Sequence, residues 1–387
     1  MGDPVGGDVD LSERLLTEEL HPNDDIEEII VDPLQAGQGL RGEAQTAQYR
    51  DVPFAVAFYL HLAVVLFFGV FWGFGSLVQE EIVHDAVDDT EEEETLNLWG
   101  IFFLVVLVSS SSIGIASYSL DFMANHAESL MQTALMVSCV ILSGVTVLLF
   151  ANESPGFGFC GLATLLFTVF YAYSVQRRIP FASANLRTAL TAIQTNYGVC
   201  MMAYALAALA NLWVLVWSLA FLGVAFRSSY CSDDVCEMSM NPFAFLFLIL
   251  SYYWTAQVLQ NVIRVTVSGV VGTWWFAPQE AQSAFSPAIV DSFSRATTYS
   301  FGSICFGSLL VAIIQTLEQV VHNLRRQRGN NMILCIVECL LHLLQRVGKY
   351  FNKWAFAYVG LYGYDYVTSG KKTLELFQTR GWSSIIS

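Results

Sequence analysis

Aromatic and polar side chains gather in one stretch of this sequence, the apolar run from Asn241 to Phe276. Trp254, Gln257 and Asn261 are three and four positions apart, so a helix with 3.6 residues per turn places them on one face. Tyr253 precedes Gln257 by four positions and lies beside them. Polar groups at membrane depth are costly unless they face other helices or a wet cavity. This pattern therefore predicts that the helix forms a wall of a solute site.

The composition around this run is that of a polytopic membrane protein. The chain has 387 residues, of which 55% are hydrophobic and 13% are charged, whereas soluble domains carry about 25% charged residues. A helix needs ~20 mostly apolar residues to cross a bilayer, and blocks of that kind recur along the chain. We expect an all-α transmembrane helical bundle with about eight spans. The spans are expected near residues 53–78, 97–119, 130–151, 157–175, 198–225, 241–276, 298–317 and 354–368.

The charged residues are unevenly distributed, and their positions predict the orientation. The net charge is −16, and most acids lie in residues 1–52 and 80–94. The first segment is expected to be a disordered acidic cytosolic tail, with the transmembrane domain in 53–387. Residues 80–95 hold nine acids and no Lys or Arg, so the positive-inside rule places this loop outside and the N-terminus in the cytosol. The lipid bilayer is then a partner, and the lack of a continuous basic face argues against nucleic acid.

The segment 318–353 gives conflicting signals. It is basic and amphipathic, so the charge rule places it in the cytosol, whereas simple alternation of spans places it outside. Either 298–317 is re-entrant or the charge bias is overridden. A pair of amphipathic helices lying in the membrane interface would also fit 318–353.

The sequence offers little for metal or covalent chemistry. No span carries paired acids, HExxH, GxSxG or a clustered His/Asp set, so we expect neither an enzyme nor a metal or other cofactor. Cys231 and Cys236 lie in an expected outer loop without other Cys or His, a poor zinc pattern. They either form a local disulfide, as the exocytosolic side permits, or remain free thiols.

Two short motifs carry weaker predictions. Gly69 and Gly73 form a GxxxG, which would let another helix approach closely. Asn152-Glu153-Ser154 fits the N-glycosylation pattern, but it lies too close to an expected span to be a firm site.

Three motifs in the second half of the chain carry a family resemblance. They are Tyr253–Val258 continuing through Val265–Val271 to Trp274–Phe276, then Ser300–Leu309, and last Asn352-Lys353, Ala355-Phe356 and Gly360–Gly363 before Ser369–Lys371. In order and separation they resemble the choline transporter-like family of solute carriers. The short acidic first outer loop resembles the branch of fungi and other unicellular eukaryotes. The resemblance covers residues 50–387.

The resemblance implies a carrier that moves choline or a related organic cation. The family fold has about ten spans of bilayer length, with two of them after the region that matches Arg380-Gly381-Trp382. The resemblance thus implies that this chain is truncated at its C-terminal end. A multi-pass protein of the plasma membrane is expected, with an organelle membrane as the alternative.

Site residues follow from the chemistry of a quaternary ammonium ion, which cannot donate a hydrogen bond and is held by aromatic faces. Trp254 and Tyr253 are expected as ring walls and Gln257 and Asn261 as polar partners. Trp213 or Tyr204 is expected on the facing helix. Each ring could instead be a packing residue or part of an interfacial belt.

Two other readings stay open at this stage. The protein could be a non-transporting membrane scaffold that docks partners, of unknown identity, through its acidic tail and basic stretch. It could also be a truncated and inactive isoform of a carrier.

Overall fold

The computed structural model describes residues 47–73, 75, 98–151, 155–227, 229–232, 235–238, 241–328 and 332–380. The chain divides into two units, Met1–Ala44 and Gln45–Ser387, and all described residues belong to the second. The predicted disordered tail, apart from 47–52, therefore lies outside the described residues, as do the acidic loop 80–95 and Asn152-Glu153-Ser154.

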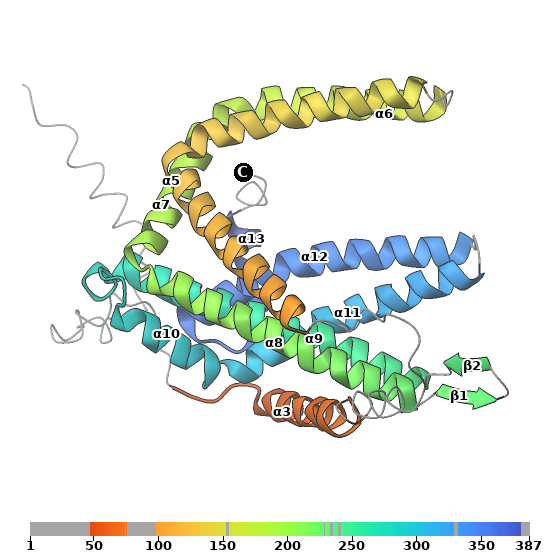
Figure 1. Ribbon diagram of the computed structural model, residues 1–387. Coiled ribbons are helices and arrows are strands. Elements are labelled where there is room, and N and C mark those ends of the chain that lie inside the picture. The colour runs from red at the N-terminus through yellow and green to blue at the C-terminus, as the bar shows by residue number, and fades with distance from the viewer. Residues whose placement is uncertain are drawn as a thin grey trace, which may run out of the picture. The chain divides into compact units, whose positions relative to one another are not determined.

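Helices make up the described part of the chain, apart from one two-stranded hairpin (Figure 1). The helices are α3 (Val52–Phe67), η2 (Phe68–Gly73), α5 (Leu98–Ala151), α6 (Pro155–Val175), η3 (Gln176–Arg178), α7 (Ile179–Thr195), α8 (Gly198–Arg227), α9 (Pro242–Phe276), η4 (Pro278–Glu280), α10 (Pro287–Thr297), α11 (Phe301–Arg328), α12 (Met332–Tyr362) and α13 (Tyr366–Arg380). The hairpin pairs β1 (Ser229–Ser232) with β2 (Val235–Met238) in antiparallel fashion.

Six helices within the described residues are long and apolar enough to cross a membrane. They are Val52–Gly73, Phe103–Ala151, Gly156–Thr195, Gly198–Ala225, Pro242–Phe276 and Phe301–Arg326. Large apolar side chains such as Leu107, Phe167 and Phe170 are exposed along them, a pattern typical of helices that face lipid. The helical fold class agrees with the sequence prediction, and a total of about eight spans stays a prediction.

Two segments expected to be connections are helical. α5 continues through 120–129, with one non-helical residue at His126 (φ −125°, ψ 27°). This segment contains no Gly or Pro, the residues that most often end a helix, so the helix bends at His126 and continues. The connection expected between the spans 157–175 and 198–225 forms α7, which has Pro180 in its first turn, a favoured position.

Close helix contacts occur where glycine removes a side chain. A Cβ at Gly73 would collide with the backbone oxygen of Leu219 on α8, and one at Gly69 would lie 3.1 Å from the Val216 oxygen. The predicted close approach at the GxxxG motif is thus confirmed, with α8 as the neighbouring helix.

α9 is the helix that positions the predicted site. Asn241 caps it by accepting a hydrogen bond from the Phe243 amide at 3.0 Å, and Pro242 occupies the first turn. The helix then packs against α3, α7, α8, α10, α11 and α12. With so many neighbours, its polar side chains meet protein on several sides.

Candidate functional site

Trp254 lies in the core with 6% of its surface exposed. Its Nε1 donates a hydrogen bond to the Cys305 carbonyl of α11 at 3.0 Å. The indole stacks on the His61 ring, with centroids 4.6 Å apart and an interplanar angle of 20°. Phe58 meets it edge-on at 5.3 Å. The predicted ring wall is therefore held between α3, α9 and α11.

His61 extends this arrangement to α8. The side chain is buried, and its Nε2 lies 3.3 Å from the Thr255 hydroxyl of α9. Its ring meets Trp213 in an edge-on contact at 6.5 Å. Phe58, His61, Trp213 and Trp254 together form what we call the aromatic cluster, which joins two predicted residues to two that sequence reasoning missed. The sequence showed these two only as a single His and a Phe in an apolar span. His61 is 194 positions from its partner Thr255, so spacing along the chain did not connect them.

Three buried polar atoms beside this cluster have no hydrogen-bond partner among the described residues. They are His61 Nδ1, Trp213 Nε1 and Ser251 Oγ. His61 Nδ1 has an electrostatic contact with the Phe58 carbonyl that falls short of hydrogen-bond geometry. Most buried polar groups in proteins are hydrogen-bonded, so these three are exceptions.

Gln257 and Asn261 face α11. The Gln257 Nε2 donates to the Gln315 Oε1 at 3.2 Å. Asn261 is fully buried; its Nδ2 donates to the Ser308 hydroxyl at 2.9 Å, and its Oδ1 accepts from the Arg264 Nη1 at 2.7 Å. The predicted polar partners are thus used to join α9 to α11.

A cavity of about 360 Å³ lies between α9, α11 and α12. Tyr253 supplies its aromatic wall, and Gln315 connects it to Gln257. The other lining residues are Glu318, Gln319, His322, Glu338 and Gln345. On a helix, Tyr253 and Gln257 lie on a different face from Ser251 and Thr255, with Trp254 between the two pairs.

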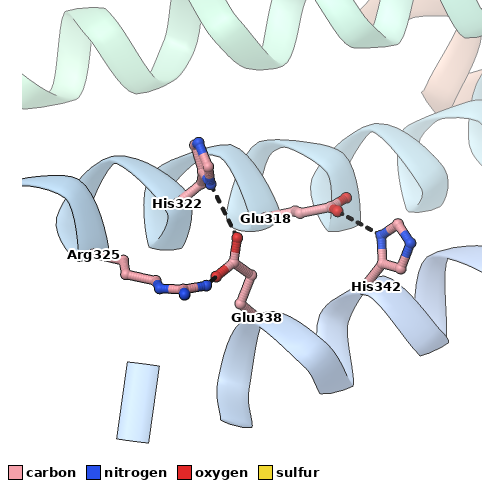
Figure 2. A network of polar contacts seen from close by, with 5 residues as sticks. All are labelled: Glu318, His322, Arg325, Glu338 and His342. Atoms are coloured by element: carbon pink, nitrogen blue, oxygen red, sulfur yellow. Dashed lines mark hydrogen bonds and ion pairs between the residues drawn. The ribbon is translucent and has the colours of Figure 1, made fainter. Parts of the chain in front are cut away.

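Glu318, His322 and Glu338 of the cavity lining also belong to a network of polar contacts between α11 and α12 (Figure 2). Both helices carry Glu-x-x-x-His, and the two copies pair reciprocally: Glu318 with His342 and Glu338 with His322, each Oε1 to Nδ1 distance being 2.9 Å. Arg325 also contacts Glu338, at 2.5 Å. Hydrogen bonds from His322 and, to a smaller extent, from Arg325 lower the pKa of the Glu338 carboxyl.

This network lies within the conflicting segment 318–353, whose topology stays a prediction. α11 is continuous from Phe301 to Arg328 and α12 from Met332 to Tyr362. Glu318, His322 and Arg325 pair with α12, while Ile336, Leu340 and other apolar side chains of α12 are exposed. The charges are therefore partly neutralised within a helical hairpin.

Tyr204 and the two loop cysteines belong neither to the aromatic cluster nor to the cavity lining. The Tyr204 hydroxyl is 2.8 Å from the Ser117 Oγ of α5. Cys231 and Cys236 are cross-strand partners in the hairpin, and such partners have Cα atoms about 4.5–5.5 Å apart, within the range that a disulfide spans. Their side chains lie outside the described residues, so the disulfide stays a prediction.

Comparison with known proteins adds independent information. Residues 159–387 match the model of a family described as plasma-membrane choline transporter. The chain is 30% identical over 270 residues to a CTL-like protein of Dictyostelium discoideum, covering 68% of this chain and 47% of that protein. It is 33% identical over 250 residues to protein PNS1 of Yarrowia lipolytica, covering 60% of this chain and 43% of that protein. The chain spans about half the length of these curated relatives.

Proposed function

The chain belongs to the plasma-membrane choline transporter family, and we propose that it carries choline or a related organic cation across a membrane. In this proposal α9 provides the helix face that contacts the solute. Transport by a member of this family needs no covalent step, so the residues act by binding and by excluding lipid.

The observation that carries the proposal is the aromatic cluster. Phe58, His61, Trp213 and Trp254 come from three span-length helices and meet inside the helix packing. A quaternary ammonium ion has no proton to donate and is attracted by aromatic faces, each contact contributing about 0.5–2 kcal/mol. Trp254 suits this role because its hydrogen bond to the Cys305 carbonyl fixes the orientation of the ring.

The cavity beside Tyr253 supports the same function at a second position. Its volume lies within the range of about 300–1,000 Å³ typical of small-molecule sites. Tyr253 offers a ring face, while Glu318 and Glu338 offer negative charge at the cavity wall. An organic cation therefore has two candidate stations along α9, one at the aromatic cluster and one at this cavity.

Uptake of labelled choline into proteoliposomes tests the proposal. Replacing Trp254 by Leu removes the ring and keeps an apolar side chain, so we expect KM to rise about 2- to 30-fold, as the loss of 0.5–2 kcal/mol implies. Trp254→Phe keeps a ring face and should restore part of the affinity. Trp275→Leu is the matched control, because that ring is on the same helix and is 64% exposed.

Two further variants distinguish the stations. If the solute binds in the cavity, Tyr253→Leu and Glu318→Gln raise KM and Trp254→Leu does not. Both sets have an effect if the solute passes both stations. Absence of saturable uptake by the folded wild-type protein would refute transport and favour the scaffold reading.

A further inference from the structure

The three unpartnered polar atoms beside the aromatic cluster come from three different helices. His61 is on α3, Trp213 on α8 and Ser251 on α9. His61 is 7% exposed and Ser251 is 2% exposed, so the solvent around the protein does not satisfy them. The His61 and Ser251 side chains are thus more than nine-tenths buried, and the Trp213 side chain is partly buried with its Nε1 out of contact with solvent. None of the three atoms has a hydrogen-bond partner among the described residues.

Contacts of the His61 ring bring the three helices together. Trp213 meets that ring edge-on at 6.5 Å, and Thr255 bonds its Nε2 at 3.3 Å. Ser251 precedes Thr255 by four positions, which puts the two hydroxyl groups on one face of α9 about one turn apart. A small ligand group placed beside His61 is therefore within reach of α3, α8 and α9 together.

Neighbouring polar groups in the same region do have partners. Trp254 Nε1 donates to the Cys305 carbonyl at 3.0 Å, and Trp217 Nε1, one turn after Trp213, donates to the Leu248 carbonyl at 2.8 Å. The packing therefore satisfies indole N–H groups on both sides of Trp213. The three unpartnered atoms therefore lack a common partner. Such a group would accept a hydrogen bond from the Trp213 indole and form another with the Ser251 hydroxyl or the His61 imidazole.

We propose that Trp213, Ser251 and His61 bind the hydroxyl group of the carried cation, so that the protein selects amino alcohols over alkylammonium ions without a hydroxyl. This inference rests on the proposed function. A hydroxyl oxygen accepts from the Trp213 N–H, which is a donor only, and the hydroxyl donates its hydrogen to Ser251 Oγ or, in the His61 tautomer protonated at Nε2, to His61 Nδ1. Trp254 and Phe58 contact the alkylated ammonium end.

Equilibrium binding of choline and tetramethylammonium to the purified full chain tests this assignment. Both are quaternary, and only choline has a hydroxyl. Trp213→Phe and Ser251→Ala should each weaken choline binding about tenfold, the loss of one hydrogen bond, and leave tetramethylammonium binding unchanged. Wild-type protein should bind choline more tightly than tetramethylammonium.

Matched controls use partnered groups on α8. Trp217→Phe removes an indole N–H that is bonded to Leu248, and Ser218→Ala removes a hydroxyl bonded to the Val214 carbonyl at 2.8 Å. Neither should change the ratio of the two affinities. Without ligand, Trp217→Phe should lower the thermal unfolding midpoint, whereas Trp213→Phe and Ser251→Ala should not, because the atoms they remove have no partner.

The outcomes separate the two levels of the proposal. Equal losses for both cations, or no loss, in Trp213→Phe and Ser251→Ala would overturn hydroxyl recognition and leave cation transport standing. The same result is expected if ordered water alone occupies this place. Wild-type protein that binds neither cation would refute the proposed function and this inference with it.

Discussion

At the scale of residues, the side chains of α9 divide between two tasks. Trp254 joins the aromatic cluster, whereas Asn261 bonds Ser308 and accepts from Arg264. Sequence spacing correctly placed these residues inside the protein, because a polar group in a span must face other helices. His61 and Ser251 were missed because their importance depends on contacts with distant residues.

The Asn261 side chain is predicted to stabilise the protein. Asn261→Leu removes the acceptor of the half-buried Arg264 and the donor to Ser308, so we expect a loss of about 0.6–2 kcal/mol, the range for such bonds in membranes. Thermal unfolding in detergent measures this. Thr266→Val is the control, since that buried hydroxyl bonds only Val262 of its own helix at 2.8 Å; an equal loss in both variants would contradict the assignment.

At the scale of elements, the bounds of α6, α8 and α9 agree with the sequence prediction within two residues, whereas the connections expected at 120–129 and after residue 175 are helical. Residues 120–129 are polar, yet without Gly or Pro they continue α5. The sequence alone also does not show that Glu318 pairs with His342 and Glu338 with His322. That pairing requires the antiparallel register of α11 and α12, which is a tertiary property.

The close contact of η2 with α8 makes a prediction about packing. Gly73→Ala places a Cβ against the Leu219 backbone, which can relieve the collision only if the two helices separate. We expect a lower thermal midpoint than in the wild type. Gly75→Ala has open space around the new Cβ and introduces a better helix former, so its midpoint should not fall; similar losses in both would argue against this contact.

At the scale of the whole molecule, the membrane class and the family follow from the sequence. Span-length apolar blocks predicted a helical membrane protein, and the motifs from Tyr253 to Lys371 resembled the family that the match over 159–387 then established. The number of spans, the orientation and the solute remain predictions. Apolar length does not show which helices cross the bilayer, and a ring in a span serves packing as well as binding.

The central claim is that an organic cation binds among rings on the inner face of α9. A density map of the full chain with saturating choline tests it most directly. We predict ligand density in contact with Trp254, with its hydroxyl end toward Trp213 and Ser251. Choline density in contact with no residue of α9, or no density under conditions where uptake is saturated, would contradict the account.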